Sequence, residues 1–107
     1  MSFQIHFHDG LPHSKRLQAD CELRSRELQG EFPETHKFVI SCSRSGERYE
    51  VHIHVTGKEG EVASSATHWV QQEAVQQAFS KAQRQLRKRH DKLIHSRRRG
   101  AQRHAAS

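Results

Sequence analysis

The spacing of apolar residues changes from a period of two to a helical period near His68. Before that point, short runs alternate apolar and polar side chains, as in strands with one buried face. After it, apolar residues recur every three to four positions over residues 75–93, as in an amphipathic helix. A chain with both patterns must cover a sheet with helix, so we expect an α+β fold.

Alternating runs predict the strands. They cover residues 3–7, 37–42, 49–55 and, with smaller side chains, 61–67. Gly46 separates the second run from the third, and a second glycine-containing turn at 56–60 separates the third from the fourth, so we expect two hairpins there. The last three strands would then form a meander.

Two helices are expected, one between the first two strands and one after the last. Ser14 can cap the first, which should run to about Gln29, with Leu17, Cys21, Leu28 and Phe32 on one side and Arg24 interrupting them. The second should begin near His68 and end near His95. Its apolar stripe consists of Val75, Ala78, Phe79, Ala82, Leu86 and Leu93. The predicted order is β-α-β-β-β-α, with one four-stranded sheet, its first two strands parallel, and both helices packed on one face.

Positive charge is concentrated at the carboxyl end. The net charge is +6. Residues 1–83 carry nine Lys or Arg against eleven Asp or Glu, a balance of −2, whereas residues 84–107 carry nine against Asp91 alone, a balance of +8. Such a cluster indicates a polyanion partner, because each neutralised phosphate releases condensed counterions. The alternative is a solvated face or a disordered tail.

The cations of the second helix fall on defined sides of it. At about 100° per residue, Arg84, Arg87 and Lys88 project opposite the apolar stripe, with Lys81 and Lys92 on its flank. Residues 96–107 show no apolar period, so we expect a domain over residues 1–95 followed by a flexible basic tail.

Other classes of protein receive less support. The chain has no run of about 20 apolar residues and no signal peptide pattern, so we expect a soluble, cytoplasmic protein without a membrane segment. Cys21 and Cys42 lack metal-site or disulfide-framework spacing and should be small buried side chains. We expect no cofactor.

Three alternatives start from single residue types. His6 with His8, and His52 with His54, each place two imidazoles on one strand face, a geometry that can chelate a metal, but nothing completes a site, so we expect none. A ribonuclease using His52 or His54 with Lys37 is conceivable, although a core this small leaves little room for a catalytic cleft. Trp69 can stack on a base, yet at a helix start a hydrophobic staple is the favoured role.

The carboxyl-terminal third has a distinctive sequence. EVASSA at residues 61–66 is followed by EAV at 73–75 and by SKAQRQLRKRHDKL at 80–93. This resembles the ribosome hibernation promoting factor and ribosome-associated inhibitor family, also called sigma-54 modulation proteins. In that family the second helix carries an Ala-Ile or Ala-Val pair and then a run like K-L-x-R-Q-L-x-K-x-K-x-K-L. The strand YEVHIHV at 49–55 also fits, so the resemblance covers most of residues 1–95.

The resemblance implies a fold akin to the double-stranded-RNA-binding domain and binding between the head and body of the small ribosomal subunit. A bacterial, non-enzymatic translation inhibitor of this kind blocks the mRNA and tRNA sites of idle ribosomes, and we expect a monomeric short form. The implied partner is 16S-type rRNA. The candidate RNA-binding residues are Lys81, Arg84, Arg87, Lys88, Arg89 and Lys92, with Arg97, Arg98 and Arg99 in the tail. The alternative is a general RNA-binding domain of the same fold with a non-ribosomal target.

Overall fold

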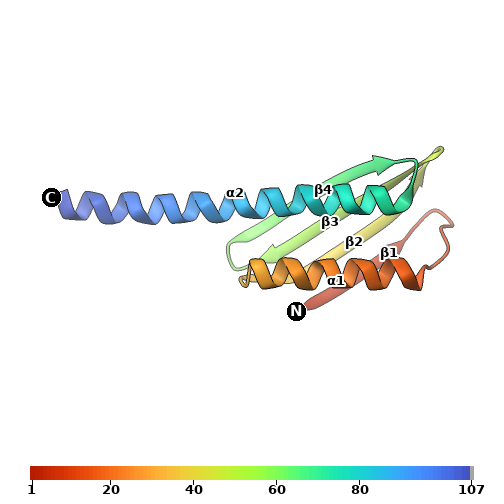
Figure 1. The fold of residues 1–107 in the computed structure, drawn as a ribbon, viewed down its shortest axis with the longest axis horizontal. Helices are drawn as coiled ribbons and strands as arrows, with labels where there is room; N and C mark the ends of the chain where they lie inside the picture. Colours follow the sequence, from red (N-terminus) through yellow and green to blue (C-terminus); the bar gives the residue numbers. More distant parts are fainter. Residues whose placement is uncertain (107) are drawn as a thin grey trace.

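The computed structural model describes the backbone of residues 1–106 and the side chains of residues 1–92. Its elements follow the predicted order and are β1 (Ser2–Phe7), α1 (Lys15–Glu31), β2 (Thr35–Ser45), β3 (Arg48–Gly57), β4 (Gly60–His68) and α2 (Gln71–Ala106). The strands form one sheet in the order β1-β2-β3-β4. β1 and β2 are parallel, and the other neighbours are antiparallel. Both helices lie on the same face of the sheet (Figure 1), which confirms the predicted α+β architecture.

The strand register aligns apolar side chains in rows beneath the helices. Ile5 pairs with Ile40, Ile40 with Ile53, and Ile53 with Ser64. The two central isoleucines are buried, as are the corresponding residues of the rows on either side. Ser64 is also buried, and its hydroxyl donates a hydrogen bond to the Ala78 carbonyl of α2 at 2.8 Å. This bond satisfies a polar group inside the core and links β4 to α2.

α1 packs through a narrow stripe that the sequence describes only in part. Its amino end is capped as predicted, because the Ser14 hydroxyl accepts a hydrogen bond from the Leu17 amide at 3.2 Å. The gap in the predicted stripe is filled by Ser25, which is buried, while Arg24 lies beside the stripe. The Ser25 hydroxyl donates to the Cys21 carbonyl at 2.8 Å, so a polar residue is accommodated there without an unpaired group.

Glycines fix the two hairpins. Gly46 has a φ of 62° in the turn between β2 and β3, and Gly60 has a φ of 117° at the start of β4. These are left-handed conformations that residues with a Cβ adopt only under strain. Gly57 is needed for a different reason, since a Cβ there would lie 2.8 Å from the Glu34 carbonyl oxygen.

Burial controls the chemistry of the two cysteines. Cys21 on α1 and Cys42 on β2 are free and fully buried, as predicted. Removal from water disfavours the thiolate and raises the pKa of Cys21 to about 12 and that of Cys42 to about 11. Both thiols therefore stay protonated and unreactive near neutral pH.

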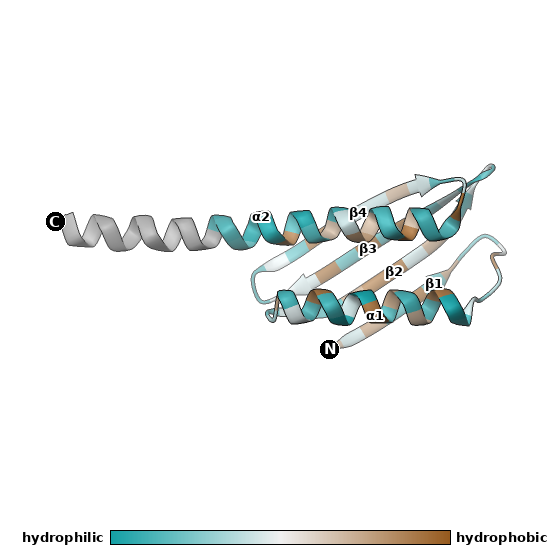
Figure 2. Ribbon diagram, viewed as in Figure 1, coloured by the Kyte–Doolittle hydropathy of each residue, from teal (hydrophilic) through white to brown (hydrophobic). Residues whose placement is uncertain are grey.

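α2 is longer than the sequence predicts. It begins at Gln71 rather than near His68, and its helical backbone continues to Ala106 rather than ending near His95. The flexibility expected for residues 96–107 stays a prediction. The predicted apolar stripe from Val75 to Leu86 is buried against the sheet, and Leu93 lies outside the residues whose side chains are described. The outward sides of both helices are largely hydrophilic (Figure 2). Within the described part of the chain, neither helix combines the length and hydropathy that crossing a membrane requires.

Candidate nucleic-acid interface

α2 is anchored on one side and free on the other. Its inner side is buried in the core and consists of Ala74, Val75, Ala78, Phe79, Ala82 and Leu86. Because these residues fix the rotation of the helix about its axis, they also fix which side chains point outward. The helix therefore presents its outer residues as a rigid array.

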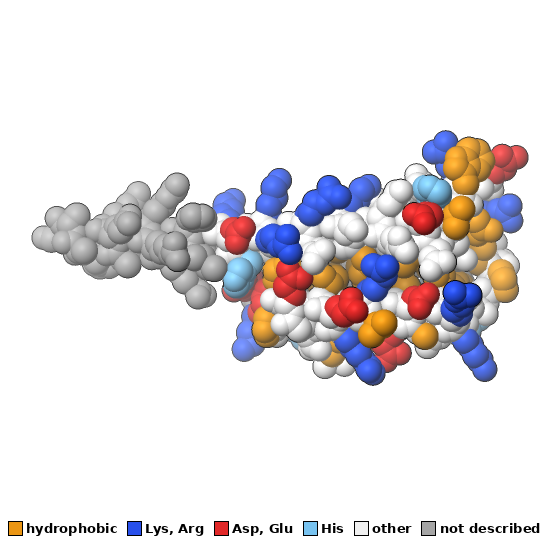
Figure 3. All heavy atoms as spheres, viewed as in Figure 1, with side chains coloured by type: hydrophobic (Ala, Val, Ile, Leu, Met, Phe, Trp, Pro, Cys, Tyr) orange, Lys and Arg blue, Asp and Glu red, His pale blue; other side chains and the backbone are white. Residues whose placement is uncertain are grey.

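Four cations of α2 form a row. Lys81, Arg84, Lys88 and Lys92 are exposed and are separated by three, four and four positions, the spacing that places residues along one side of a helix. We call these four residues the cationic row. It lies on the side of α2 that faces away from α1, where Figure 3 shows lysine and arginine side chains following one another along the helix. A row of this kind can neutralise consecutive phosphates of a nucleic acid backbone.

Arg87, which the sequence groups with these cations, points elsewhere. Its guanidinium donates to a carboxylate oxygen of Glu31 on α1 at 2.8 Å. The side-chain amide of Gln83 donates to the other oxygen of Glu31, also at 2.8 Å. The hydrogen bonds from Arg87 and Gln83 lower the pKa of Glu31. The hydrogen bond to the Glu31 carboxylate in turn raises the pKa of Arg87. Arg87 thus joins the two helices, although 59% of its side chain remains accessible to solvent.

Arg89 is half-buried and turns toward the sheet. Its guanidinium donates to the Glu61 carbonyl at 2.6 Å, and it packs so closely over Gly60 that a Cβ at that glycine would collide with it. The contact fastens α2 to the start of β4. From the sequence, Arg89 is only a candidate RNA-binding residue, and that role stays a prediction.

The outer edge of β4 runs beside the cationic row. β4 is an edge strand of the sheet, paired with β3 alone. Two carbonyls on this edge accept hydrogen bonds from α2, that of Ser65 from the Lys81 ammonium at 2.9 Å and that of Glu61 from Arg89. An open hollow on the same edge is lined by His52, Ala63, Ser64, Ser65, Lys81 and Gln85. The row and this edge therefore make one continuous polar surface.

Arg97, Arg98 and Arg99, the predicted contacts of the tail, lie outside the residues whose side chains are described. The helical backbone of α2 passes through all three positions. Their part in RNA binding stays a prediction.

The uncovered face of the sheet carries the histidines. His52 lies 2.7 Å from a carboxylate oxygen of Glu50, and His54 lies 3.0 Å from one of Glu61. The His6 and His8 rings on and beside β1 are 6.1 Å apart between centroids, and β2 separates them from His52 and His54. Among the described residues, no group of three metal-ligating side chains comes together.

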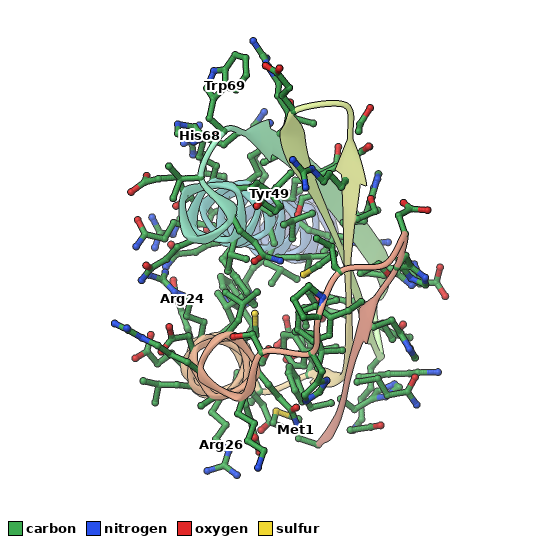
Figure 4. All side chains as sticks on the ribbon, turned by 90° about the vertical axis from the view of Figure 1, so that its right-hand side faces the viewer. Met1, Arg24, Arg26, Tyr49, His68 and Trp69 are labelled. Carbon is green, nitrogen blue, oxygen red and sulfur yellow. The ribbon has the colours of Figure 1, made fainter. Side chains whose placement is uncertain are left out.

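Trp69 differs from the sequence prediction. Rather than a buried staple, it is a side chain that is 56% exposed, and its neighbour Val70 is 51% exposed. The Arg48 guanidinium carbon lies 4.8 Å from the indole centroid. Figure 4 shows Trp69 extending from the end of the molecule on the side away from α1. The Val70 carbonyl accepts the first hydrogen bond of the helix from the Ala74 amide, so Trp69 does lie at the position of a staple, directly ahead of the helix cap. The staple prediction was wrong because the ring stays largely in solvent beside Arg48.

Similarities to known proteins agree with this fold. A sequence model of the family described as sigma 54 modulation protein / S30EA ribosomal protein matches residues 3–94. The structure is similar to that of a ribosomal subunit interface protein from Coxiella burnetii, with a TM-score of 0.75 and 19% identity over 82% of this chain and 96% of that chain. It is also similar to the N-terminal domain of Protein Y from Thermus thermophilus, with a TM-score of 0.73 and 14% identity over 82% of this chain and 98% of that chain. No curated protein sequence matches this chain significantly.

Proposed function

Because the chain belongs to the sigma 54 modulation protein / S30EA ribosomal protein family, we propose that it is a hibernation-type translation inhibitor that binds the small ribosomal subunit. The family consists of ribosome-associated factors and is not enzymatic. Membership of this family therefore supports a ribosome-associated role. We propose that the protein acts in the cytoplasm. The choice of subunit, the rRNA contacts and the inhibition are the proposal.

The observation that carries the proposal is the cationic row. Its four side chains are exposed on one side of a helix whose other side is locked into the core. The backbone of this array is already ordered before binding, so engaging phosphates requires ordering only the side chains themselves. Folded RNA is recognised largely by shape and by phosphate and 2′-hydroxyl contacts, so no base-reading motif is required for this step.

Inhibition would follow from occupancy. The molecule measures 61 × 25 × 16 Å along its principal axes, which is bulky enough to exclude other ligands from the surface that it covers. Bound through α2 to 16S-type rRNA in the cleft between head and body, a monomer would deny that space to mRNA and tRNA. We further propose that residues 96–107, with Arg97, Arg98 and Arg99, act as a basic extension of the 1–95 domain and add contacts to the same RNA.

The first prediction concerns the row itself. Reversing Arg84, Lys88 and Lys92 to Glu should abolish co-sedimentation with purified small subunits at physiological salt, because attraction to phosphate becomes repulsion. A matched control is Lys15→Glu, Arg16→Glu and Lys58→Glu, which makes the same change in net charge at exposed positions off α2. The control should still co-sediment, and circular dichroism should show both variants folded.

Two results would contradict this assignment. Equal loss of binding in both variants would mean that only overall charge matters, and retained binding in the row variant would remove α2 as the contact surface. A general RNA-binding domain would instead bind free duplex RNA as tightly as small subunits. Inhibition of translation in a reconstituted system, relieved by the row reversal, would connect binding to function.

A further inference from the structure

We propose that Trp69 and Arg48 form a stacking platform for an unpaired base of the bound RNA. The platform is separate from the cationic row and rests on the proposed function, since it would engage the same nucleic acid. It would give the protein a base contact that phosphate binding alone does not provide.

The first step is the exposure of the indole. Trp69 and Val70 occupy the short connection between the end of β4 at His68 and the start of α2 at Gln71. They are two of the four large hydrophobic side chains exposed in the described part of the chain, and the only two that are adjacent in sequence. A tryptophan carries a large apolar area, so leaving more than half of it in water forgoes stabilisation that a partner would restore.

The second step is the fixed position of the ring. The Arg48 guanidinium lies over one face of the indole, 4.8 Å from its centroid. The connection is held beneath it, because the Val70 amide donates to the His68 ring nitrogen at 2.9 Å and His68 pairs with Tyr49 of β3. Arg48 lies over one face of the ring and more than half of the Trp69 side chain is exposed, so we assign the base to the opposite face. A planar group stacking there would find the ring already oriented.

The third step decides the kind of partner. Trp69 and the cationic row lie on the same side of the molecule, away from α1 (Figures 3 and 4). At about 1.5 Å per residue, Lys81 is roughly 15 Å along the helix axis from Gln71, and Trp69 lies two residues ahead of Gln71, so one polynucleotide that follows α2 could reach both. Each base has a π-face that stacks on an aromatic ring without sequence preference, and arginine adds a cation–π contribution. The location beside a phosphate-binding row therefore favours a nucleobase over a protein side chain.

The chain offers a direct probe, because Trp69 is its single tryptophan. The full-length protein would be titrated with a short oligoadenylate and with an abasic oligonucleotide of equal length and phosphate number. Tryptophan fluorescence would report on the indole, and anisotropy of the labelled nucleic acid would report on binding. We expect saturating oligoadenylate to quench Trp69 and the saturating abasic strand to leave its emission unchanged. Equal quenching by both strands, or none by the oligoadenylate, would overturn the platform.

Substitutions extend the test to the ribosome. Trp69→Leu keeps an apolar side chain but removes the ring, and it should weaken binding to small subunits roughly tenfold, the range expected for one stacked base. Trp69→Phe keeps a ring and should recover most of the loss. Leucine binding as tightly as the wild type would overturn the proposal. So would quenching of the wild-type protein by whole subunits but not by deproteinised rRNA, which would identify a ribosomal protein as the partner.

The two proposals fail in different ways. If Trp69→Leu has no effect while the reversal of the cationic row abolishes binding, the platform is wrong and the proposed function stands. If the wild-type protein does not bind small subunits at all, the proposed function is wrong. Base-dependent quenching by the oligoadenylate would still show a stacking site on the protein.

Discussion

Arg84 and Arg87 lie three positions apart on α2, yet they have different surroundings. Arg84 belongs to the exposed row, whereas Arg87 is paired with Glu31 of α1. An RNA phosphate that recruited Arg87 would have to displace a carboxylate that already holds it. We therefore expect Arg84 to contribute more to RNA affinity than Arg87, although a helical projection treats the two as equivalent.

The Glu31–Arg87 pair predicts a pH dependence of folding stability. The hydrogen bond from Arg87 lowers the pKa of Glu31 in the folded state, so folding favours the carboxylate. The resulting stability is present above the ordinary glutamate pKa and is lost as the pH falls through the lowered value. Glu31→Gln should therefore reduce the urea midpoint slightly at neutral pH, and the difference from wild type should vanish in acid. The effect is small because the pair is exposed.

Glu27→Gln on the same helix provides the matched control, since Glu27 has no ion-pair partner among the described residues. Urea unfolding of the two variants across the acid range checks the prediction. If their difference from wild type follows the same pH profile, the Arg87 contact makes no specific contribution to stability.

At the scale of elements, the outer edge of β4 is open to pairing with another strand. An edge strand exposes unpaired backbone groups that can recruit another strand and cause self-association. Here Lys81 and Arg89 donate to the Ser65 and Glu61 carbonyls on that edge. Side chains of α2 thus occupy two of the hydrogen-bonding positions that a second molecule would use.

Removing this cover should promote self-association. The double variant Lys81→Ala, Arg89→Ala frees both carbonyls, so we expect concentration-dependent oligomers in sedimentation velocity experiments. Arg84→Ala with Lys88→Ala removes the same charge and touches neither carbonyl, so it should stay monomeric. Equal association of the two variants would show that charge loss, rather than edge exposure, is responsible.

The elements illustrate what sequence can predict. The buried stripe of α2 is predictable because it depends only on helical periodicity. The different contacts of Arg87 and Arg89 are not predictable, because a helical projection gives only the direction of each side chain about the helix axis. It does not show which part of the protein lies in that direction. Arg87 contacts α1 and Arg89 contacts the start of β4, and both neighbours are placed by tertiary packing. The burial of Ser25 on α1 is not predictable from the sequence either, because serine is polar and Arg24 beside it interrupts the apolar stripe. A hydrogen bond from the Ser25 hydroxyl to the Cys21 carbonyl makes the buried position acceptable.

At the scale of the whole molecule, the topology is predictable because few alternatives exist. A crossover helix between the first two strands makes them parallel, and two glycine-containing turns make the rest a meander. The exposure of Trp69 is not predictable in this way, since a position directly ahead of a helix does not fix the direction in which the side chain points. Here the ring lies beside Arg48 of β3, a neighbour that only the tertiary structure supplies.

Salt dependence tests the electrostatic contribution of the entire surface. If the four cations of the row each neutralise one phosphate, the slope of log K against log salt should be about −2.8 to −3.6. Affinity for small subunits should then fall roughly 50- to 150-fold between about 50 and about 200 mM salt. Deleting residues 96–107 should make the slope shallower if the tail also contacts RNA. A slope near zero in the full chain would point to a protein partner instead.

α2 is both a wall of the hydrophobic core and the proposed contact surface, so folding and binding share one element. A ligand that binds α2 only when the protein is folded shifts the folding equilibrium toward the native state by mass action. Copies in excess of available ribosomes would unfold more often and meet cellular proteases sooner than those in complex. If the proposed function holds, the amount of this protein would then follow the number of ribosomes that bind it, without a dedicated sensor.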